Sequence, residues 1–448
     1  MSWLDQKWKL WGLLGVVLFL AFPPSAYASV IRDTEIEHGL MKIITPMAAE
    51  AGLDPKAMKV RVVINPAYNA FVAGDNMIYV HSGLVIDADN MLEVAGVLAH
   101  EIGHIASGHI PRRNEVVQSA TMNTIVSAVA AMALSASGNP DAAVGVIAGG
   151  TDRSRRIILA RSRQDEGVAD EWAIKLMQSQ NLSLQPLAEA MRRFASQRSL
   201  PESRQSDYYL THPGAKERSA VFQDHVNTQE TEPAQEPQWM ADLHRRIKTK
   251  LLGWTTPPKT TIAATINQSD EAALYQQAIA YYRLSDLTTA IEHMDRLLAM
   301  TPNNPYYWEF YGDLHLSSGL ADAAVAAYEK ALGLLKDQSP DPVNQGQIYL
   351  SMGRALMIKG GDDAKAAAVN ALEQAHLEEP EWAFVKRQLG IAYGKIGRFA
   401  AADLILAEEA LLSGNNELAV RLAKRVSSHE DASAVQKQLA ADIIGQSK

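Results

Sequence analysis

The sequence has 448 residues, a formal net charge of −9 at pH 7 and no cysteine. This length exceeds what a single hydrophobic core usually supports, so it predicts two or three domains. The negative charge argues against a nucleic-acid partner. Without cysteine the chain can form no disulfide and can offer no thiolate to a metal.

The N-terminus has the pattern of a secretory signal peptide. Lys7 and Lys9 precede an unbroken apolar run over residues 10–22, which is followed by two prolines and a small-residue sequence that ends at Ala28. The apolar run is shorter than the roughly 20 residues that span a bilayer, so an uncleaved membrane anchor is the less favoured alternative. We expect cleavage after Ala28 and export of the remaining chain.

Two segments rich in β-branched and aromatic residues predict a small β-sheet. They are KVRVVIN over residues 59–65 and AFVAGDNMIYVHSG over residues 70–83, the second with a Gly-Asp-Asn turn at its centre. An exposed edge of this hairpin could pair with the extended backbone of a substrate, or the hairpin could serve only as core. Both interpretations stay open at this point.

A helix is predicted over residues 91–109, directly after the hairpin. Asn90 and Glu93 have the spacing of a capping box, and Pro111 limits the extension of the helix. The flanks MLEVAGVLA and IGHIA are apolar or small, so we expect this helix to be buried. Buried polar side chains need partners, which makes the histidines of this helix informative.

The sequence HEIGH within this helix predicts a metal site. His100 and His104 are four residues apart and therefore lie on one face of the helix, where both imidazoles can bind one Zn²⁺. Glu101 lies about 100° round the helix, a position typical of a general base rather than a metal ligand. His109 does not match the spacing of a third histidine ligand, so we expect it to be a helix-end residue or to contact a ligand histidine.

A second charged segment, RQDEGVADEWAIKLM over residues 163–177, offers a third ligand. Glu166 and Asp170 are also four residues apart and face the same way on a helix. Glu166 would complete a site of two histidines and one glutamate, and Asp170 would accept a hydrogen bond from a ligand histidine. The alternative is an ordinary helix start, where acidic residues are favoured.

Between these two segments, residues 119–150 are apolar and rich in alanine and glycine. The run is interrupted by SASGNPD, so neither half is long enough to span a membrane. We expect a helical hairpin that covers the cleft. A mobile lid, a tightly packed hairpin and peripheral contact with a membrane are all left open.

The chain resembles the zinc metallopeptidase family of the CaaX prenyl protease and the heat-shock protease HtpX. The resemblance extends from about Ile31 to about Pro258 and is carried by four segments: IRDTEIEHGL, NAFVAGDNMIYVHSGLV, HEIGH and EGVAD. It implies a zincin-like metalloprotease domain with one Zn²⁺ per chain. The same resemblance implies that the metal is held by His100, His104 and Glu166, with Glu101 as the catalytic base.

The sequence Thr-His-Pro at residues 211–213, together with Arg218, is similar to a motif that this family carries close to its active site. His212 could stabilise the oxyanion of the transition state. It could instead occupy the open metal position and keep the enzyme latent. The alternative is a loop histidine that only fixes a turn before Pro213.

The segment after Arg218 predicts the end of the first domain. Residues 226–238 are polar and are expected to form an exposed loop, and residues 239–254 predict an amphipathic helix. The sequence TTPPKTT at residues 255–261 predicts the hinge to the next domain.

The remaining chain contains tetratricopeptide-like repeats. Ala278, Gly312, Gly353 and Gly390 occupy equivalent small positions at spacings of 34, 41 and 37 residues. Further consensus positions are filled by Trp308, Ala324, Tyr328 and Ala331. We expect four helical hairpins and trailing helices that stack into an α-solenoid with a groove for peptides or partner proteins. The alternative is a solenoid that only shields or positions the protease.

Together these patterns predict a mainly α protein with a small β-sheet. The predicted units are a signal peptide (1–28), a zinc metallopeptidase domain (29–258) and a tetratricopeptide-repeat domain (259–448). By resemblance, we expect a periplasmic endopeptidase for misfolded or stalled envelope proteins, whose repeats recruit unfolded substrates or dock to an outer-membrane assembly complex. The alternative is a chaperone or scaffold for outer-membrane protein assembly, with a largely latent peptidase site.

Overall fold

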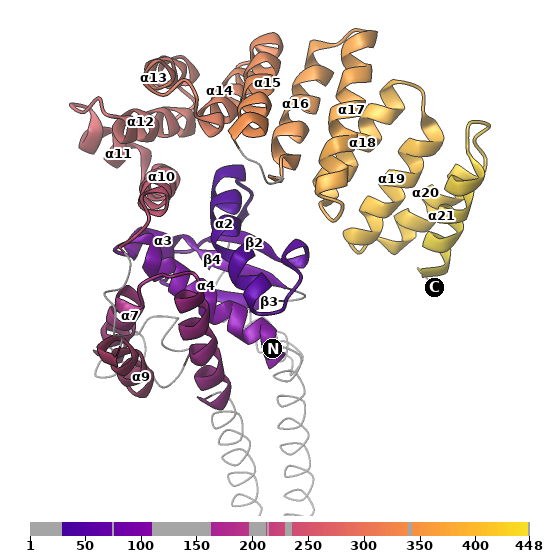
Figure 1. The fold of residues 1–448 in the computed structure, drawn as a ribbon. Helices are drawn as coiled ribbons and strands as arrows, with labels where there is room; N and C mark the ends of the chain where they lie inside the picture. Colours follow the sequence, from indigo (N-terminus) through magenta and orange to yellow (C-terminus); the bar gives the residue numbers. More distant parts are fainter. Residues whose placement is uncertain are drawn as a thin grey trace, which may run out of the picture.

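The computed structural model describes residues 29–73, 76–109, 163–196, 212, 215–228, 235–338 and 343–446. The predicted signal peptide and the predicted hairpin at 119–150 lie outside these residues. The described chain is mainly α-helical with one small sheet, as the sequence predicts (Figure 1). Among its helices, none combines the length and the apolar character that crossing a membrane requires.

The sheet has four strands in the order β1-β2-β4-β3. Their bounds are β1 (Ser29–Ile31), β2 (Lys59–Ile64), β3 (Ala70–Ala73) and β4 (Met77–His81). The β3–β4 hairpin and β2 are the predicted strands. β2 and β4 are parallel, with Val60 opposite Ile78, whereas the other two pairs are antiparallel. β1 was not predicted, because three residues are too few to show an alternating pattern. β3 is an edge strand of this sheet.

The helices of the N-terminal half surround α4 (Met91–Ala106), which packs against α2, α7, α10 and β3. Val94, Val97 and Leu98 of α4 are fully buried in the core. The other elements of this half are α2 (Thr34–Glu50), η1 (Pro55–Ala57), α3 (Ser82–Asp87), the helical residues 163–179, α7 (Gln185–Ser196), α9 (Ala215–Thr228) and α10 (Gln238–Thr255).

The ends of α4 test the predicted capping signals. The Asn90 side chain accepts a hydrogen bond from the Glu93 backbone N–H at 3.1 Å, as the capping pattern predicts. The predicted C-terminus at His109 is wrong, because α4 ends at Ala106. A turn at Ser107 and Gly108 follows, and Gly108 has a φ of +64°, a conformation that glycine adopts without strain.

The predicted loop at 226–238 is only partly correct. Its first three residues, 226–228, form the end of α9, and its last residue begins α10. The polar side chains at 226–228 can remain in contact with solvent while the backbone continues the helix α9, because the earlier turns of α9 are already packed. α11 (Pro258–Thr265) begins within the predicted hinge at 255–261.

The C-terminal half consists of stacked helical hairpins that arch over the N-terminal half (Figure 1). At Gly312, an added Cβ would lie 2.6 Å from the Tyr328 ring of the paired helix, which explains the small residue at this repeat position. The same holds for Gly353 against Leu372 and for Gly390 against Leu406, each at 2.6 Å. The predicted repeats are therefore confirmed as hairpins. They comprise α12 (Glu271–Arg283) with α13 (Leu287–Met300), α14 (Pro305–Ser317) with α15 (Ala321–Gln338), α16 (Gly346–Lys359) with α17 (Asp362–Glu378), and α18 (Ala383–Lys395) with α19 (Phe399–Leu412), followed by α20 (Asn416–Val426) and α21 (Ala434–Gln446).

The two halves are joined by ion pairs as well as by the chain. Glu379, after α17, lies 2.5 Å from the guanidinium of Arg32 and 3.3 Å from that of Arg61 on β2. Both arginines also pair with Glu37 of α2, at 3.1 and 2.7 Å. The Arg32 guanidinium lies 4.2 Å from the ring centroid of Trp382. This interdomain ion cluster fixes the repeats against the sheet.

Candidate metal centre

α4 places the two histidines of HEIGH side by side in the core. The Nε2 atoms of His100 and His104 lie 3.1 Å apart, and the His100 side chain is 1% exposed. Burial lowers the pKa of His104 to about 3, so its ring is neutral and its lone pair can bind a metal. The four-residue spacing on a well-capped helix is what aligns the two rings.

Glu166 reaches this pair because α4 and the helical residues 163–179 approach closely at a glycine. A Cβ added to Gly103 would lie 2.7 Å from the Trp172 Cβ and 2.9 Å from the Ala169 carbonyl oxygen. With no side chain at Gly103 the helices can touch. Glu166 Oε2 then lies 3.3 Å from His100 Nε2, and Glu166 Oε1 lies 3.4 Å from His104 Nε2.

His212 completes the cluster from a distant part of the chain. Its Nδ1 lies 3.0 Å from Glu166 Oε2 and 3.3 Å from His100 Nε2. One ligand atom from each of His100, His104, Glu166 and His212 falls within 4.8 Å of the others. Three imidazoles and one carboxylate are a donor set that suits a divalent transition metal such as zinc, so these residues fit the predicted ion.

Glu101 lies beside the cluster and is not a member of it. Its carboxylate is buried, and Oε1 accepts no hydrogen bond from any residue that the structure describes. The Nε2 of His212 lies 3.6 Å from this oxygen. Burial raises the pKa of Glu101 above the usual glutamate value. A buried carboxylate whose pKa is raised in this way can take up a proton.

Asp170 and Arg218 support the cluster from behind His100. Asp170 Oδ1 lies 3.0 Å from His100 Nδ1, the ring nitrogen that points away from the cluster. Arg218 donates two hydrogen bonds of 2.7 Å to the two Asp170 oxygens. Burial alone would raise the pKa of Asp170, but the Arg218 charge and these hydrogen bonds lower it. The ionised Asp170 can therefore orient the His100 ring.

His104 has a different partner on its second nitrogen. Its Nδ1 lies 2.9 Å from His109 Nδ1, and His109 Nε2 lies 3.6 Å from Asp165 Oδ1. His109 therefore contacts His104, a predicted ligand, and is not in the four-residue cluster. The role of Asp165 was not predicted, although its place next to Glu166 is a signal that could have found it.

The structure thus brings together all the site residues that the sequence indicated. The resemblance placed Arg218 near the site, but the sequence did not show its partners, which include Glu166 Oε2 in an ion pair of 2.8 Å. Arg218 lies at the start of α9, six residues after His212, and it is 6% exposed. Its pairing with the two carboxylates becomes visible only when the packing of α9 is known.

Comparisons with known proteins show which families the chain is similar to. The model of peptidase family M48 matches residues 36–225, and a tetratricopeptide-repeat model matches residues 275–341. The β-barrel assembly-enhancing proteases of Yersinia pestis and Escherichia coli K12 are each 24% identical to the chain, over 72% and 69% of its length. The matches cover 67% and 62% of those two proteins. Metalloprotease LoiP of Escherichia coli K12 is 28% identical over 42% of the chain and 70% of its own length.

Proposed function

We propose that this chain, whose residues 36–225 belong to peptidase family M48, is a zinc-dependent endopeptidase that acts on unfolded or misassembled proteins. The observation that carries the proposal is the cluster of His100, His104, Glu166 and His212, with the buried carboxylate of Glu101 beside it. A site that only stabilised the fold would not need a further buried carboxylate there.

In the proposed mechanism, His100, His104 and Glu166 would hold one Zn²⁺. When bound, the zinc would polarise the scissile carbonyl and favour a hydroxide nucleophile. Glu101 removes a proton from the attacking water and later donates it to the leaving amine nitrogen. Asp170, itself held by Arg218, keeps the His100 ring in the orientation that ligation needs.

The edge of the sheet suggests how a substrate could lie across this site. β3 is an edge strand and packs against α4, the helix that carries HEIGH. An extended peptide could add to this edge through main-chain hydrogen bonds, which would accept many sequences. Such recognition suits a protease for unfolded chains.

The cellular role rests on the relatives and on the repeats. The names of the relatives in Yersinia pestis and Escherichia coli connect them to β-barrel assembly. We assign this chain to the quality control of stalled outer-membrane proteins in the periplasm, after removal of residues 1–28. Stacked helical repeats commonly bind protein partners, so we assign to them the recruitment of substrate or of an assembly complex.

His212 supports a second candidate, a chaperone or scaffold with a latent peptidase site. A fourth protein ligand excludes the water that Glu101 must deprotonate. The ligand atoms of His212 and of the other three residues lie within 4.8 Å of one another, which supports such a closed centre. In that case, the binding of partners by the repeats would be the main activity.

Replacing Glu101 by glutamine tests the peptidase proposal. The Glu101→Gln variant keeps the shape of the side chain but loses the proton acceptor, so we expect cleavage of an unfolded protein such as casein to fall by about 10²–10⁴. The metal content should not change. The exposed Glu171→Gln, on the helical residues 163–179, is a matched control that should keep full activity. Full activity of Glu101→Gln would contradict the mechanism.

A further inference from the structure

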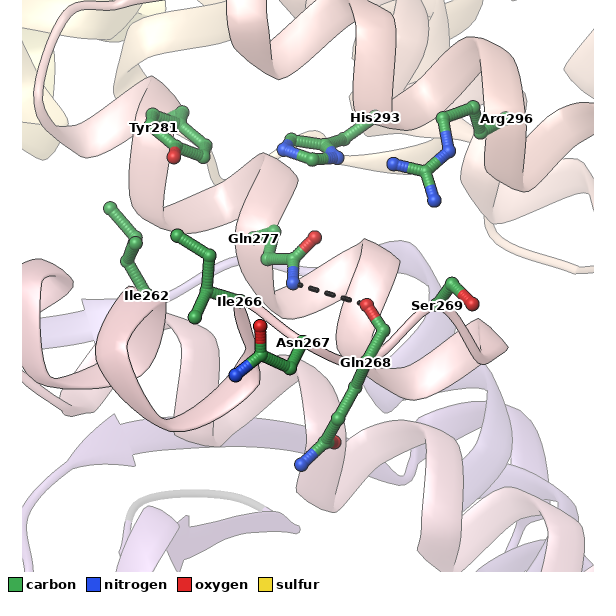
Figure 2. Close-up of a pocket in the computed structure, with 9 residues that line it drawn as sticks. All are labelled: Ile262, Ile266, Asn267, Gln268, Ser269, Gln277, Tyr281, His293 and Arg296. Carbon is green, nitrogen blue, oxygen red and sulfur yellow. Dashed lines mark hydrogen bonds between the residues drawn. The ribbon is translucent and has the colours of Figure 1, made fainter.

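A cavity of about 210 Å³ lies in the first repeat, between α11, α12 and α13 (Figure 2). None of these helices carries a residue of the metal cluster. At about 30 Å³ per water molecule, the cavity has room for about seven waters, or for one end residue of a peptide. Its walls include Ile262, Ile266, Gln277, Tyr281, His293 and Arg296.

The floor of the cavity presents a fixed hydrogen-bond acceptor. Gln277 is 3% exposed, and its Nε2 donates to the Thr265 carbonyl oxygen at 2.5 Å, which determines the orientation of the amide. Its Oε1 accepts no hydrogen bond from any residue of the described chain. Figure 2 shows this oxygen on the side of the cavity where His293 and Arg296 lie. A ligand N–H could satisfy it.

The rim carries a positive charge without a counterion. No carboxylate lines the cavity, and Arg296 of α13 has no carboxylate within ion-pair distance among the described residues. Beside it, the His293 ring stacks on Tyr281 with 5.3 Å between the ring centroids. A guanidinium in this setting is suited to a carboxylate, to which it can donate two parallel hydrogen bonds.

The third wall is apolar. Ile262 and Ile266 lie along one side of the cavity in Figure 2, and Ile266 is 61% exposed. An exposed isoleucine next to a polar floor leaves apolar surface that a ligand side chain could cover. The lining of the cavity therefore combines an acceptor, a cation and an apolar wall.

We propose that this cavity binds the C-terminal end of a polypeptide whose last residue is apolar. The terminal carboxylate pairs with Arg296, the N–H of the last residue donates to Gln277 Oε1, and its side chain covers Ile266. A chain end presents these three groups within one residue, whereas an internal aspartate or glutamate has no apolar side chain beside its carboxylate. The repeats would thus capture polypeptides by their ends, independently of the metal centre.

Fluorescence anisotropy of a labelled peptide tests this site in the full chain. The probe is an octapeptide of glycine and serine with a fluorophore at its N-terminus and a C-terminal leucine with a free carboxylate. Binding is measured in the Glu101→Gln background, so that the result does not depend on cleavage. We expect saturable binding that weakens at least tenfold when the C-terminus is amidated, since a charge-assisted hydrogen bond is lost.

Two variants assign the binding to the cavity. Arg296→Gln should weaken binding at least tenfold, whereas the exposed Arg421→Gln on α20 should not change it. Ile266→Ser should reduce the preference for a final leucine over a final glycine. Circular dichroism melting confirms that each variant is folded.

Three results would overturn the proposal. The first is the absence of saturable binding by the free-acid peptide. The second is equal binding of the acid and the amide, or binding that Arg296→Gln leaves unchanged. The third is equally tight binding of an amidated peptide that ends in glutamate, because the ligand would then be a side-chain carboxylate rather than a chain end.

Discussion

His212 shows how one residue can decide whether the metal centre is open. Its Nδ1 faces the cluster at 3.0 Å from Glu166, while its Nε2 faces Glu101 at 3.6 Å. The ring therefore lies between Glu166, the proposed third ligand, and Glu101, the proposed catalytic base. In this position it can act as a latch on the metal, or it can move to stabilise the oxyanion once a substrate has entered.

Replacing His212 by alanine distinguishes these two roles. If His212 is a latch, His212→Ala should raise the basal cleavage of casein, because the fourth metal position becomes available to water. If His212 is an oxyanion donor, the rate should fall by about 10²–10³ with the metal retained. We expect the increase. His225→Ala on α9 is the control, and an unchanged rate in His212→Ala would exclude both roles and leave a turn-forming histidine.

At the scale of elements, the contact between α4 and the helical residues 163–179 sets the geometry of the site. The contact depends on Gly103, because the Trp172 Cβ and the Ala169 carbonyl oxygen occupy the space that a side chain would need. The proposed ligands His100 and His104 lie on one of these helices and Glu166 on the other. Any separation of the two helices therefore moves Glu166 away from the histidines.

The Gly103→Ala variant should lose metal before it loses its fold. Overpacking at this contact should lower the free energy of unfolding by about 1–3 kcal/mol and reduce metal affinity at least tenfold. Metal content after dialysis and the melting temperature measure the two effects. Gly167→Ala is the matched control, because nothing lies within 4 Å of an added Cβ there. Equal metal content in both variants would contradict the role of this contact.

At the scale of the whole molecule, the interdomain ion cluster holds the repeats against the sheet. Glu379→Gln removes the charge that Arg32 and Arg61 share, so we expect the domain interface to weaken by about 1.5–3 kcal/mol. Small-angle scattering should show a larger radius of gyration, and the melting temperature should fall. The exposed Glu381 forms a pair with Lys59 across the same interface, and Glu381→Gln should change stability by less than about 1 kcal/mol. Equal effects of the two variants would argue against a special role of Glu379.

A second interdomain contact should make stability depend on pH. Glu309 of α14 accepts a hydrogen bond of 2.8 Å from the Thr34 hydroxyl of α2, and burial raises the pKa of Glu309 to about 8. A raised pKa in the folded state means that folding favours the protonated carboxyl. The resulting contribution to the free energy of unfolding is complete below the pKa of Glu309 in the unfolded state, about 4.5. It is lost as the pH rises to about 8.

The Glu309→Gln variant should remove this pH dependence, because its amide stays neutral. Melting temperatures measured between pH 5 and pH 8.5 should fall more steeply in the parent protein than in Glu309→Gln. Glu292→Gln, an exposed substitution on the neighbouring α13, should follow the parent. Parallel pH profiles of the parent protein and Glu309→Gln would show that Glu309 titrates normally.

Local spacing in the sequence was enough to predict much of this protein. His100 and His104 share a face because a helix repeats every 3.6 residues, and the same argument relates Glu166 to Asp170. The repeats were visible for a similar reason, since Gly312, which meets Tyr328, recurs as a small residue in the following hairpins. Patterns of this kind depend only on neighbours in the chain.

The tertiary structure decided which distant groups meet. The residues that flank Arg218 in the chain do not show that it binds Asp170. In the same way, the neighbours of His212 and Glu379 do not show that His212 lies between Glu166 and Glu101, or that Glu379 pairs with an arginine of the sheet. These contacts join segments that lie far apart in the chain, and they exist because the packing of whole helices brings them together. The sequence therefore determined which groups could bind a metal, whereas the packing decided how the site is oriented, closed and connected to the repeats.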